Sequence, residues 1–365
     1  MDNFAFIIHP LDPKRDVKRK FPLLGKVLPV PAINFLSRFF PPLYISHITG
    51  VRSEATGKEV EGWFVACPFT PQRMMTLPPQ TVYRKVIATA QLAERLGAKL
   101  VGLGAYTSVV GDGGVTISQS VKVPVTTGDS YTVASAVAAL KQAAKMMGID
   151  VRAATLAVVG ATGAIGSVAA ELLAEDVAHV LLIGKRFDRL AAIKVRCERA
   201  GAEVQVATDL AELHRADLVL TVTSAMDAII QPRHLKPGAV VCDVARPRDV
   251  SKAVAEQRDD VLVFEGGLVE VPGPEADFHF DFGFPLKTCY ACMAETIALA
   301  LEGCYESYSL GKDLTVTQVK KIDEIARRHG FRLAGYRSFE HAVPVEAIER
   351  IKANAQRARQ SYAVI

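Results

Sequence analysis

The strongest constraint on the fold of this chain is a glycine-rich stretch at residues 155–186. Residues 155–159 form a short β-branched and apolar run, and three evenly spaced glycines follow it: Gly160, Gly163 and Gly166. Helix-forming residues come next, and 179–183 is a second apolar run. This order predicts strand, glycine turn, helix and strand, with backbone N–H groups presented to a pyrophosphate. The alternative is a tight turn that binds nothing.

Further strands extend the pattern beyond this unit. Apolar runs at 203–207, 217–223, 238–244 and 261–265 alternate with a helix or short crossovers. Such alternation predicts an α/β fold with a doubly wound, Rossmann-type parallel sheet. Ligands bind at the carboxyl ends of these strands. The residues predicted to bind a dinucleotide are therefore Gly160, Ala161, Thr162, Gly163, Ala164, Ile165, Gly166, Thr223, Ser224 and Gly267.

The end of the second strand indicates which nicotinamide cofactor binds. An NAD site usually places Asp or Glu about 20 residues after the turn, where it binds the ribose 2′-OH. Lys185 and Arg186 stand at this point, and Asp188 resembles the cap of the next helix. Two cations would form charge-assisted hydrogen bonds with a 2′-phosphate. We therefore predict NADPH, with a solvated Lys-Arg pair as the alternative.

Length and hydrophobic content predict more than one folded domain, since the chain has 365 residues and half of them are hydrophobic. We expect an N-terminal α/β substrate-binding domain at 1–130 and a connecting helix at 131–150. The Rossmann NADP-binding domain is expected at 151–285. C-terminal helices at 286–365 are expected to pack back across the cleft. Thr126 to Ser130 form a polar turn before a helix, which suits either a substrate cleft or plain helix capping.

Charge and targeting signals bear on partners and location. The formal net charge is only +4, which does not indicate a nucleic-acid partner. No apolar run reaches the ~20 residues that cross a bilayer, and no secretory signal is visible. The six cysteines are scattered, as in reduced proteins. We predict a cytoplasmic protein.

Residues 14–44 combine basic and apolar residues with several prolines, which prevent one long helix. This composition suits peripheral contact with an anionic membrane. A loop buried against the N-terminal domain explains it equally well. A third use is electrostatic docking of an acidic carrier protein.

Two cysteines, Cys289 and Cys292, lie near the start of a helix predicted at Lys287–Gly303. A helix N-terminus lowers the pKa of a thiol, and a thiolate can attack a thioester. A lone CxxC pair is poor evidence for zinc, so no metal site is predicted. From residue types alone, small core residues remain the favoured interpretation of both cysteines.

Several separate blocks resemble the long-chain acyl-[acyl-carrier-protein] reductases of cyanobacterial alkane synthesis. The resemblance runs from about Ile48 to Phe331 and includes the blocks LGAYTSVV, TTGDSYTVA, AVVGATGAIGS, EGGLVE, YACMAET and RHGF. It implies that Cys292 accepts the acyl group, because it matches the family's nucleophile, whereas Cys289 falls where the family usually lacks cysteine. It also implies an acyl carrier protein or coenzyme A thioester of a long-chain fatty acid as substrate. NADPH would reduce the acyl-enzyme to a fatty aldehyde, and Mg²⁺ is implied as an aid by the resemblance alone.

Two segments depart from the family, and other functions stay open. Phe21–Tyr44 is more basic and apolar than the usual acidic counterpart, and a basic helix is predicted at Val345–Gln360. No general acid or base is assigned, because His329 also suits the last turn of a helix. One alternative is a shikimate-dehydrogenase-like NADP oxidoreductase acting on a small polar ketone or alcohol. Another is a non-catalytic, membrane-associated NADP-binding protein.

Overall fold

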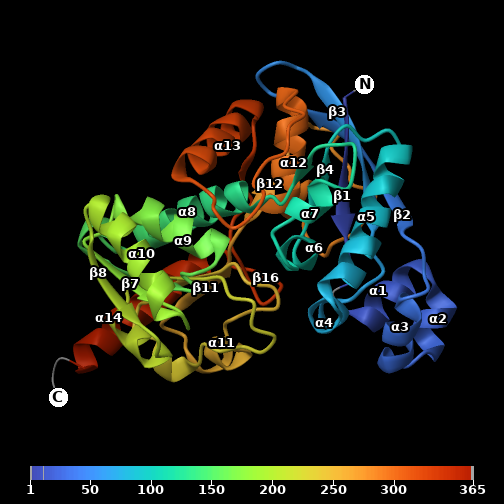
Figure 1. Ribbon diagram of the computed structural model, residues 1–365. Helices are drawn as coiled ribbons and strands as arrows, with labels where there is room; N and C mark the ends of the chain where they lie inside the picture. The colour runs from blue at the N-terminus through green and yellow to red at the C-terminus, as the bar shows by residue number, and fades with distance from the viewer. Residues whose placement is uncertain (1, 11, 363–365) are drawn as a thin grey trace. The chain divides into compact units, whose positions relative to one another are not determined.

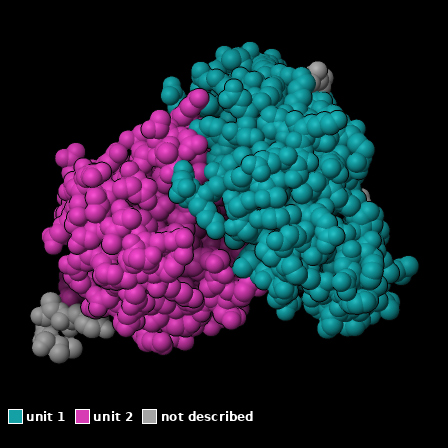
Figure 2. Space-filling view, viewed as in Figure 1, with its two compact units in different colours: residues 1–128, 270–313, 324–332 teal, residues 129–269, 314–323, 333–365 magenta. Residues whose placement is uncertain are grey.

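The computed structural model describes residues 2–10 and 12–362, and they form two compact units (Figure 2). Unit 1 contains residues 1–128, 270–313 and 324–332, and unit 2 contains the remainder. Within the described part of the chain, no helix has the length and apolar character needed to span a membrane.

Unit 1 is built on a five-stranded sheet of order β2-β3-β1-β4-β5 (Figure 1). Its strands are β1 (Asn3–Ile8), β2 (Leu43–Arg52), β3 (Glu59–Ala66), β4 (Val101–Leu103) and β5 (Val125–Thr126). β2 and β3 form an antiparallel hairpin, whereas β1, β3, β4 and β5 run parallel. Four residues of β1, Phe4 to Ile7, are buried, which suits its central position in the sheet.

Successive strand residues point to opposite faces of a sheet, and Phe4 to Ile7 of β1 are all buried. Both faces are therefore apolar, and helices cover both. On one face, α5 (Pro79–Arg95) buries Val82, Val86 and Ala90 against a cluster that includes Ala5 and Ile7 of β1. α12 (Ala291–Glu302) contacts β1, β3 and β4. Shorter helices complete the unit: α4 (Pro71–Thr76), α6 (Tyr106–Val109) and α7 (Val115–Ser118).

The basic and apolar N-terminal segment folds as three short helices rather than as a loop. They are α1 (Pro13–Lys20), α2 (Pro22–Val27) and α3 (Val30–Ser37), and a proline stands in the first turn of each. Proline is tolerated there because its missing N–H has no partner in the first turn. The prediction that prolines prevent one long helix is therefore confirmed. The alternative of a loop buried against the N-terminal domain is wrong about the loop, because the segment is helical, but it does pack within unit 1.

Unit 2 contains a six-stranded parallel sheet of order β11-β10-β9-β6-β7-β8. The strands are β6 (Thr155–Val159), β7 (His179–Ile183), β8 (Glu203–Ala207), β9 (Leu218–Thr221), β10 (Val240–Asp243) and β11 (Leu262–Glu265). The order reverses between β6 and β9, which is the switch point of a Rossmann fold. The predicted doubly wound α/β fold is confirmed.

The helices and short pieces of unit 2 pack around this sheet. They are α8 (Asp129–Met146), α9 (Ala164–Ala174), α10 (Phe187–Arg199), α11 (Lys252–Gln257) and α14 (Val345–Tyr362), with the 3₁₀ turns η1 (Val151–Ala153), η2 (Leu210–Arg215) and η3 (Pro232–His234) and the hairpin strands β15 (Arg337–Ser338) and β16 (His341–Ala342). α13 (Val316–His329) and the short strands β12 (Leu268–Glu270) and β14 (Arg332–Leu333) carry residues of both units.

Two boundaries differ from those expected. The helix predicted to begin at Lys287 begins at Ala291, because Thr288–Tyr290 forms the short strand β13. Thr and Tyr favour extended backbone, and Tyr290 stands in that conformation as the N-cap. Residues 286–365 were expected as one part, but α12 lies in unit 1 and α14 in unit 2. α14 is held there by the side chain of Arg359, which donates to the carbonyl of Pro237.

Candidate active site

The glycine turn of unit 2 joins β6 to α9 at the switch point of the sheet. Gly160 has a φ of +82°, and a Cβ there would stand 2.3 Å from the carbonyl oxygen of Val222. A Cβ at Gly166 would stand 2.4 Å from the carbonyl oxygen of Gly160. Only glycine permits this close packing of the turn, the helix and the loop after β9.

The start of α9 is suited to an anion. Gly163 is the N-cap, and no side chain caps the helix. The first N–H groups of a helix lack intrahelical partners and carry the positive end of the dipole. Gly163 is exposed, and Thr162, Ala164 and Ile165 are half-buried. The turn therefore presents the cradle that a pyrophosphate requires, and the predicted residues Gly160 to Gly166 lie together in it.

Lys185 and Arg186 follow β7 directly, and both are exposed. They stand at the end of the second strand, the position at which a Rossmann-type site meets the ribose of its nucleotide. Asp188 was expected to cap the next helix, but Arg186 is the N-cap of α10 and Asp188 lies in its first turn. An acid there interacts with the helix dipole, so it needs no capping role.

Thr223 and Ser224 follow β9 on the other side of the switch point. Asp249, which is fully buried, accepts hydrogen bonds from the Thr221 hydroxyl at 2.6 Å and the Thr223 backbone N–H at 2.9 Å. The Thr223 hydroxyl also donates to this carboxylate. Asp249 thus fixes the loop that closes the cradle. Sequence reasoning missed Asp249, which lies about 25 residues further along the chain with no spacing signal.

Gly267 lies apart from this cradle, because it follows the edge strand β11 with β10 between that strand and β9. Asp243 at the end of β10 is buried, and its carboxylate accepts from the N–H groups of Ala245 and Val250, each at 3.0 Å. Burial raises the pKa of Asp243 to about 6 despite the nearby Arg246 guanidinium.

In unit 1, Cys292 and Cys289 have different surroundings. Cys292 is the second residue of α12 and is half-buried. Cys289 lies in β13 and is fully buried, which raises the pKa of its thiol well above the ordinary value. A thiol that is hard to ionise is a poor nucleophile. The geometry therefore separates the two cysteines, which the residue types alone did not.

The TTG turn after β5 packs directly against the Cys292 backbone. A Cβ at Gly128, whose φ is +77°, would stand 2.2 Å from Cα of Cys292. Thr126 donates its hydroxyl to the carboxylate of Glu295, one turn beyond Cys292, and both residues are fully buried. These contacts fix the start of α12. Glu295 was missed, although a lone acid in the apolar run ACMAETIALAL was a usable signal.

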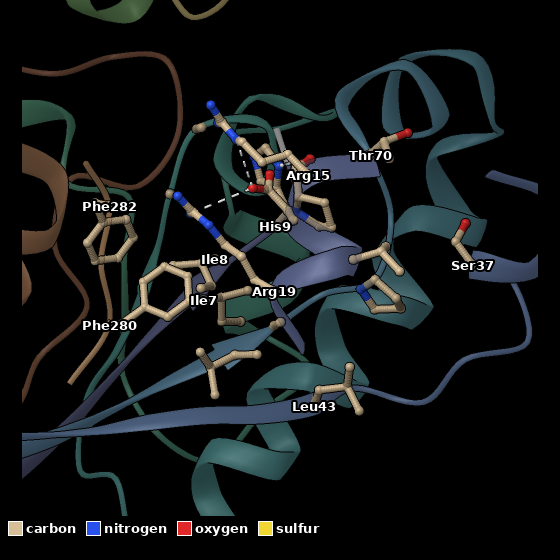
Figure 3. A pocket seen from close by; sticks show the side chains of 18 of the residues that line it. Ile7, Ile8, His9, Arg15, Arg19, Ser37, Leu43, Thr70, Phe280 and Phe282 are labelled. Atoms are coloured by element: carbon tan, nitrogen blue, oxygen red, sulfur yellow. Dashed lines mark hydrogen bonds and ion pairs between the residues drawn. The ribbon is translucent and has the colours of Figure 1, made fainter. Parts of the chain in front are cut away.

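A cavity of about 730 Å³ lies within unit 1 (Figure 3). Cys292 is part of its wall. The wall is largely aliphatic and aromatic, with residues from the end of β1, from α1 to α3, from β2 and from the loop before β13. The aromatic members include Phe280 and Phe282, whose ring centroids are 4.7 Å apart. Cavities of about 300–1,000 Å³ hold small molecules and cofactors.

Several polar and charged side chains line part of the otherwise apolar cavity wall, and charged ones among them are paired. Asp16 forms ion pairs with Arg15 at 3.4 Å and Arg19 at 3.7 Å. The Arg19 guanidinium also lies over the ring of Phe280 (Figure 3). His9 lines the same wall, and burial lowers its pKa to about 4, so the ring is neutral at pH 7.

His329 has a structural environment. It is the last residue of α13, as predicted, and it is buried. Its Nδ1 lies 2.8 Å from the Ser53 hydroxyl and its Nε2 lies 2.9 Å from a Glu302 carboxylate oxygen. The wall of the cavity does not include it. Among the described residues, no group of three or more His, Cys, Asp or Glu side chains is arranged to hold a metal ion.

Comparison with known proteins indicates the class of protein to which this site belongs. Residues 141–265 match the model of the shikimate / quinate 5-dehydrogenase family. The chain is 29% identical over 307 residues to a long-chain acyl-[acyl-carrier-protein] reductase from Synechococcus elongatus, covering 80% of this chain and 87% of that protein. Together with the Rossmann-type sheet and its glycine turn, these matches define an NAD(P)-dependent oxidoreductase type of protein.

A second relative is longer. The chain is 32% identical over 304 residues to aminotransferase PigE from a Serratia strain, covering 82% of this chain. It spans only 35% of the length of that relative.

Solved structures give more distant matches. L-Tryptophan dehydrogenase from Nostoc punctiforme has a TM-score of 0.40 at 13% identity, covering 98% of this chain and 89% of that one. Shikimate 5-dehydrogenase from Listeria monocytogenes has a TM-score of 0.37 at 10% identity, covering 96% of each chain.

Proposed function

We propose that this protein reduces a long-chain acyl thioester to a fatty aldehyde, with Cys292 as the acyl-accepting nucleophile and NADPH as the reductant. The observation that carries the proposal is the position of Cys292 in the wall of a large apolar cavity. An acyl chain needs an apolar site, whereas a small polar ketone needs several charged or hydrogen-bonding groups around it. The cavity therefore favours the thioester over the shikimate-like alternative.

The first half of the reaction forms an acyl-enzyme. The Cys292 sulfur attacks the carbonyl carbon, a new C–S bond forms, and the bond to the donor sulfur breaks, so that the donor leaves as a thiol. The start of α12 favours the thiolate, because the positive end of the helix dipole lies there. Gly128 and the Thr126–Glu295 hydrogen bond hold this helix start in place.

The second half requires two electrons. The turn at Gly160–Gly166 would hold the pyrophosphate, and Lys185 and Arg186 would pair with a 2′-phosphate. NADPH held there would supply the hydride that the acyl carbon on Cys292 needs. The C–S bond to Cys292 would then break, the aldehyde would leave, and the cysteine sulfur would take up one proton from solvent to return as the thiol. The similarity to the Synechococcus elongatus acyl-[acyl-carrier-protein] reductase supports an acyl carrier protein as donor, with coenzyme A as the alternative.

The test compares the activity of wild type with that of cysteine variants. The substrates are the hexadecanoyl thioesters of acyl carrier protein and of coenzyme A. Wild type with NADPH is expected to release hexadecanal. Cys292→Ala should lose about a thousandfold or more in rate, because the acyl acceptor is gone. Cys289→Ala and Cys304→Ala are matched controls and should retain activity. Without NADPH, intact-mass analysis should detect one acyl group on wild type and none on Cys292→Ala.

Full aldehyde production by Cys292→Ala would refute the covalent mechanism. Reduction of small polar ketones by wild type, without turnover of either thioester, would instead establish the shikimate-like alternative. Gas chromatography of the aldehyde and the absorbance change on cofactor oxidation both report the reductive half, and intact-mass analysis without NADPH reports the acylation half.

A further inference from the structure

We propose that α1, α2 and α3 form a membrane-docking surface for an anionic lipid bilayer, placed over the apolar cavity of unit 1. We call residues 12–40 the N-terminal cap. The use of the cavity for an acyl chain rests on the proposed function, whereas binding of the cap to lipid does not. α1 contacts both α2 and α3, and the three helices lie together in unit 1 (Figure 1).

The cap is apolar on two sides. Its inward side contributes several residues to the cavity wall: Val17, Phe21, Leu28, Ile33, Leu36 and Phe40. On the outward side, large apolar side chains are exposed to solvent: Leu23 at 78%, Val27 at 75%, Phe35 at 55% and Phe39 at 67%. A helix on the surface of a globular protein normally turns its polar face outward. Clustered exposed apolar residues indicate a surface that another phase or molecule covers.

The charge of the cap indicates what covers it. Residues 12–40 contain seven Lys or Arg and two Asp, with no Glu. Lys14 and Lys18 are exposed. The Arg38 guanidinium lies 5.8 Å from the ring centroid of Phe35 and 5.6 Å from that of Phe39. Cations beside exposed aromatic and aliphatic side chains suit the headgroup region of an anionic bilayer, where chains insert and cations meet phosphates.

An acidic carrier protein would also be attracted by these cations. It would not account for four large apolar side chains with more than half of their surface exposed. An anionic bilayer accounts for both the cations and the exposed apolar side chains, because phosphates pair with cations and the acyl region accepts apolar groups. Leu24 belongs to the cavity wall and is also 39% exposed, so the lining of the cavity continues into the outward surface. Lipid at this surface would be continuous with the apolar interior in which an acyl chain lies.

The experiment is co-sedimentation of the full chain with vesicles of phosphatidylglycerol and phosphatidylcholine, or of phosphatidylcholine alone. Wild type is expected to bind the anionic vesicles and to bind neutral ones at least about tenfold more weakly. Phe35→Ser with Phe39→Ser, and separately Lys14→Glu with Lys18→Glu, should each weaken binding about tenfold or more. Val195→Ser with Val345→Ser removes exposed apolar residues elsewhere and should bind like wild type.

Circular dichroism and thermal unfolding check that each variant is folded. None of the four substituted cap residues lines the cavity, so turnover of a detergent-dispersed thioester should stay within about twofold of wild type.

Absence of wild-type binding to anionic vesicles would overturn the inference. Undiminished vesicle binding by the folded Phe35→Ser, Phe39→Ser variant would also overturn it. A third result would assign the cap to the carrier protein instead. In that case wild type would not bind vesicles, and the Lys14→Glu, Lys18→Glu variant would lose binding to acyl carrier protein. Vesicle binding is measured without catalysis. The binding result therefore tests the membrane inference even if the protein does not reduce acyl thioesters.

Discussion

Gly128→Ala tests whether the TTG turn positions Cys292. The added Cβ would stand 2.2 Å from Cα of Cys292, whereas ordinary contacts begin at 3.4 Å, so the turn and the start of α12 must separate by more than an ångström. The positive φ adds a conformational cost of about 1–2 kcal/mol, and overpacking adds about 1–3 kcal/mol. A misplacement of about 1 Å at a reacting group can cost about a hundredfold in rate. We expect the free energy of unfolding to fall by about 2–5 kcal/mol and acylation of Cys292 to slow about a hundredfold.

The assay measures the two effects separately. Chemical denaturation gives the loss of stability, and rapid-quench mass spectrometry without NADPH gives the rate of acylation. Gly335→Ala is the matched control, because Gly335 also has a φ of +77° and a Cβ there meets nothing within 4 Å. It should show the conformational cost of about 1–2 kcal/mol and acylate normally. A folded Gly128→Ala protein that acylates at the wild-type rate would refute the reasoning.

Three further predictions concern the cofactor, the support of α12 and the cavity wall. Lys185→Asp with Arg186→Ala should raise the KM for NADPH about tenfold or more and bring it near that for NADH; equal use of both cofactors by wild type would contradict the assignment. Thr126→Val removes the donor of the Thr126–Glu295 hydrogen bond and Glu295→Leu removes its acceptor. Each should slow acylation about tenfold, and the double variant should be no slower than the worse single one, since both break the same hydrogen bond; additive effects would show separate roles. His9 has a pKa lowered by burial from 6.5 to about 4, so the stability of its neutral form is present above pH 6.5 and is lost as pH falls from 6.5 toward 4. His9→Gln should therefore lose less stability than wild type over that window in denaturant titrations, and parallel curves would disprove the coupling.

Much of unit 2 followed from the sequence. The βαβ pattern, the glycine spacing and the strands after it were predictable, because period and turn chemistry are local properties. The doubly wound, parallel character of the sheet also followed, since parallel crossovers allow few topologies. The strand order, with its switch between β6 and β9, came from the structure. The role of Asp249 did not follow, because its partners Thr221 and Thr223 are brought to it only by the loop after β10.

The sequence by itself determined that the chain contains a dinucleotide-type turn followed by two cations, and that a CxxC pair stands near a helix start. It could not distinguish Cys289 from Cys292 on residue types, because burial depends on what packs against each thiol. Tertiary structure buried Cys289 and placed Cys292 between the Gly128 turn and an apolar cavity. It also decided that the N-terminal cap lines that cavity on one side and exposes apolar side chains on the other. Both results depend on contacts between residues distant in sequence, which no local pattern encodes.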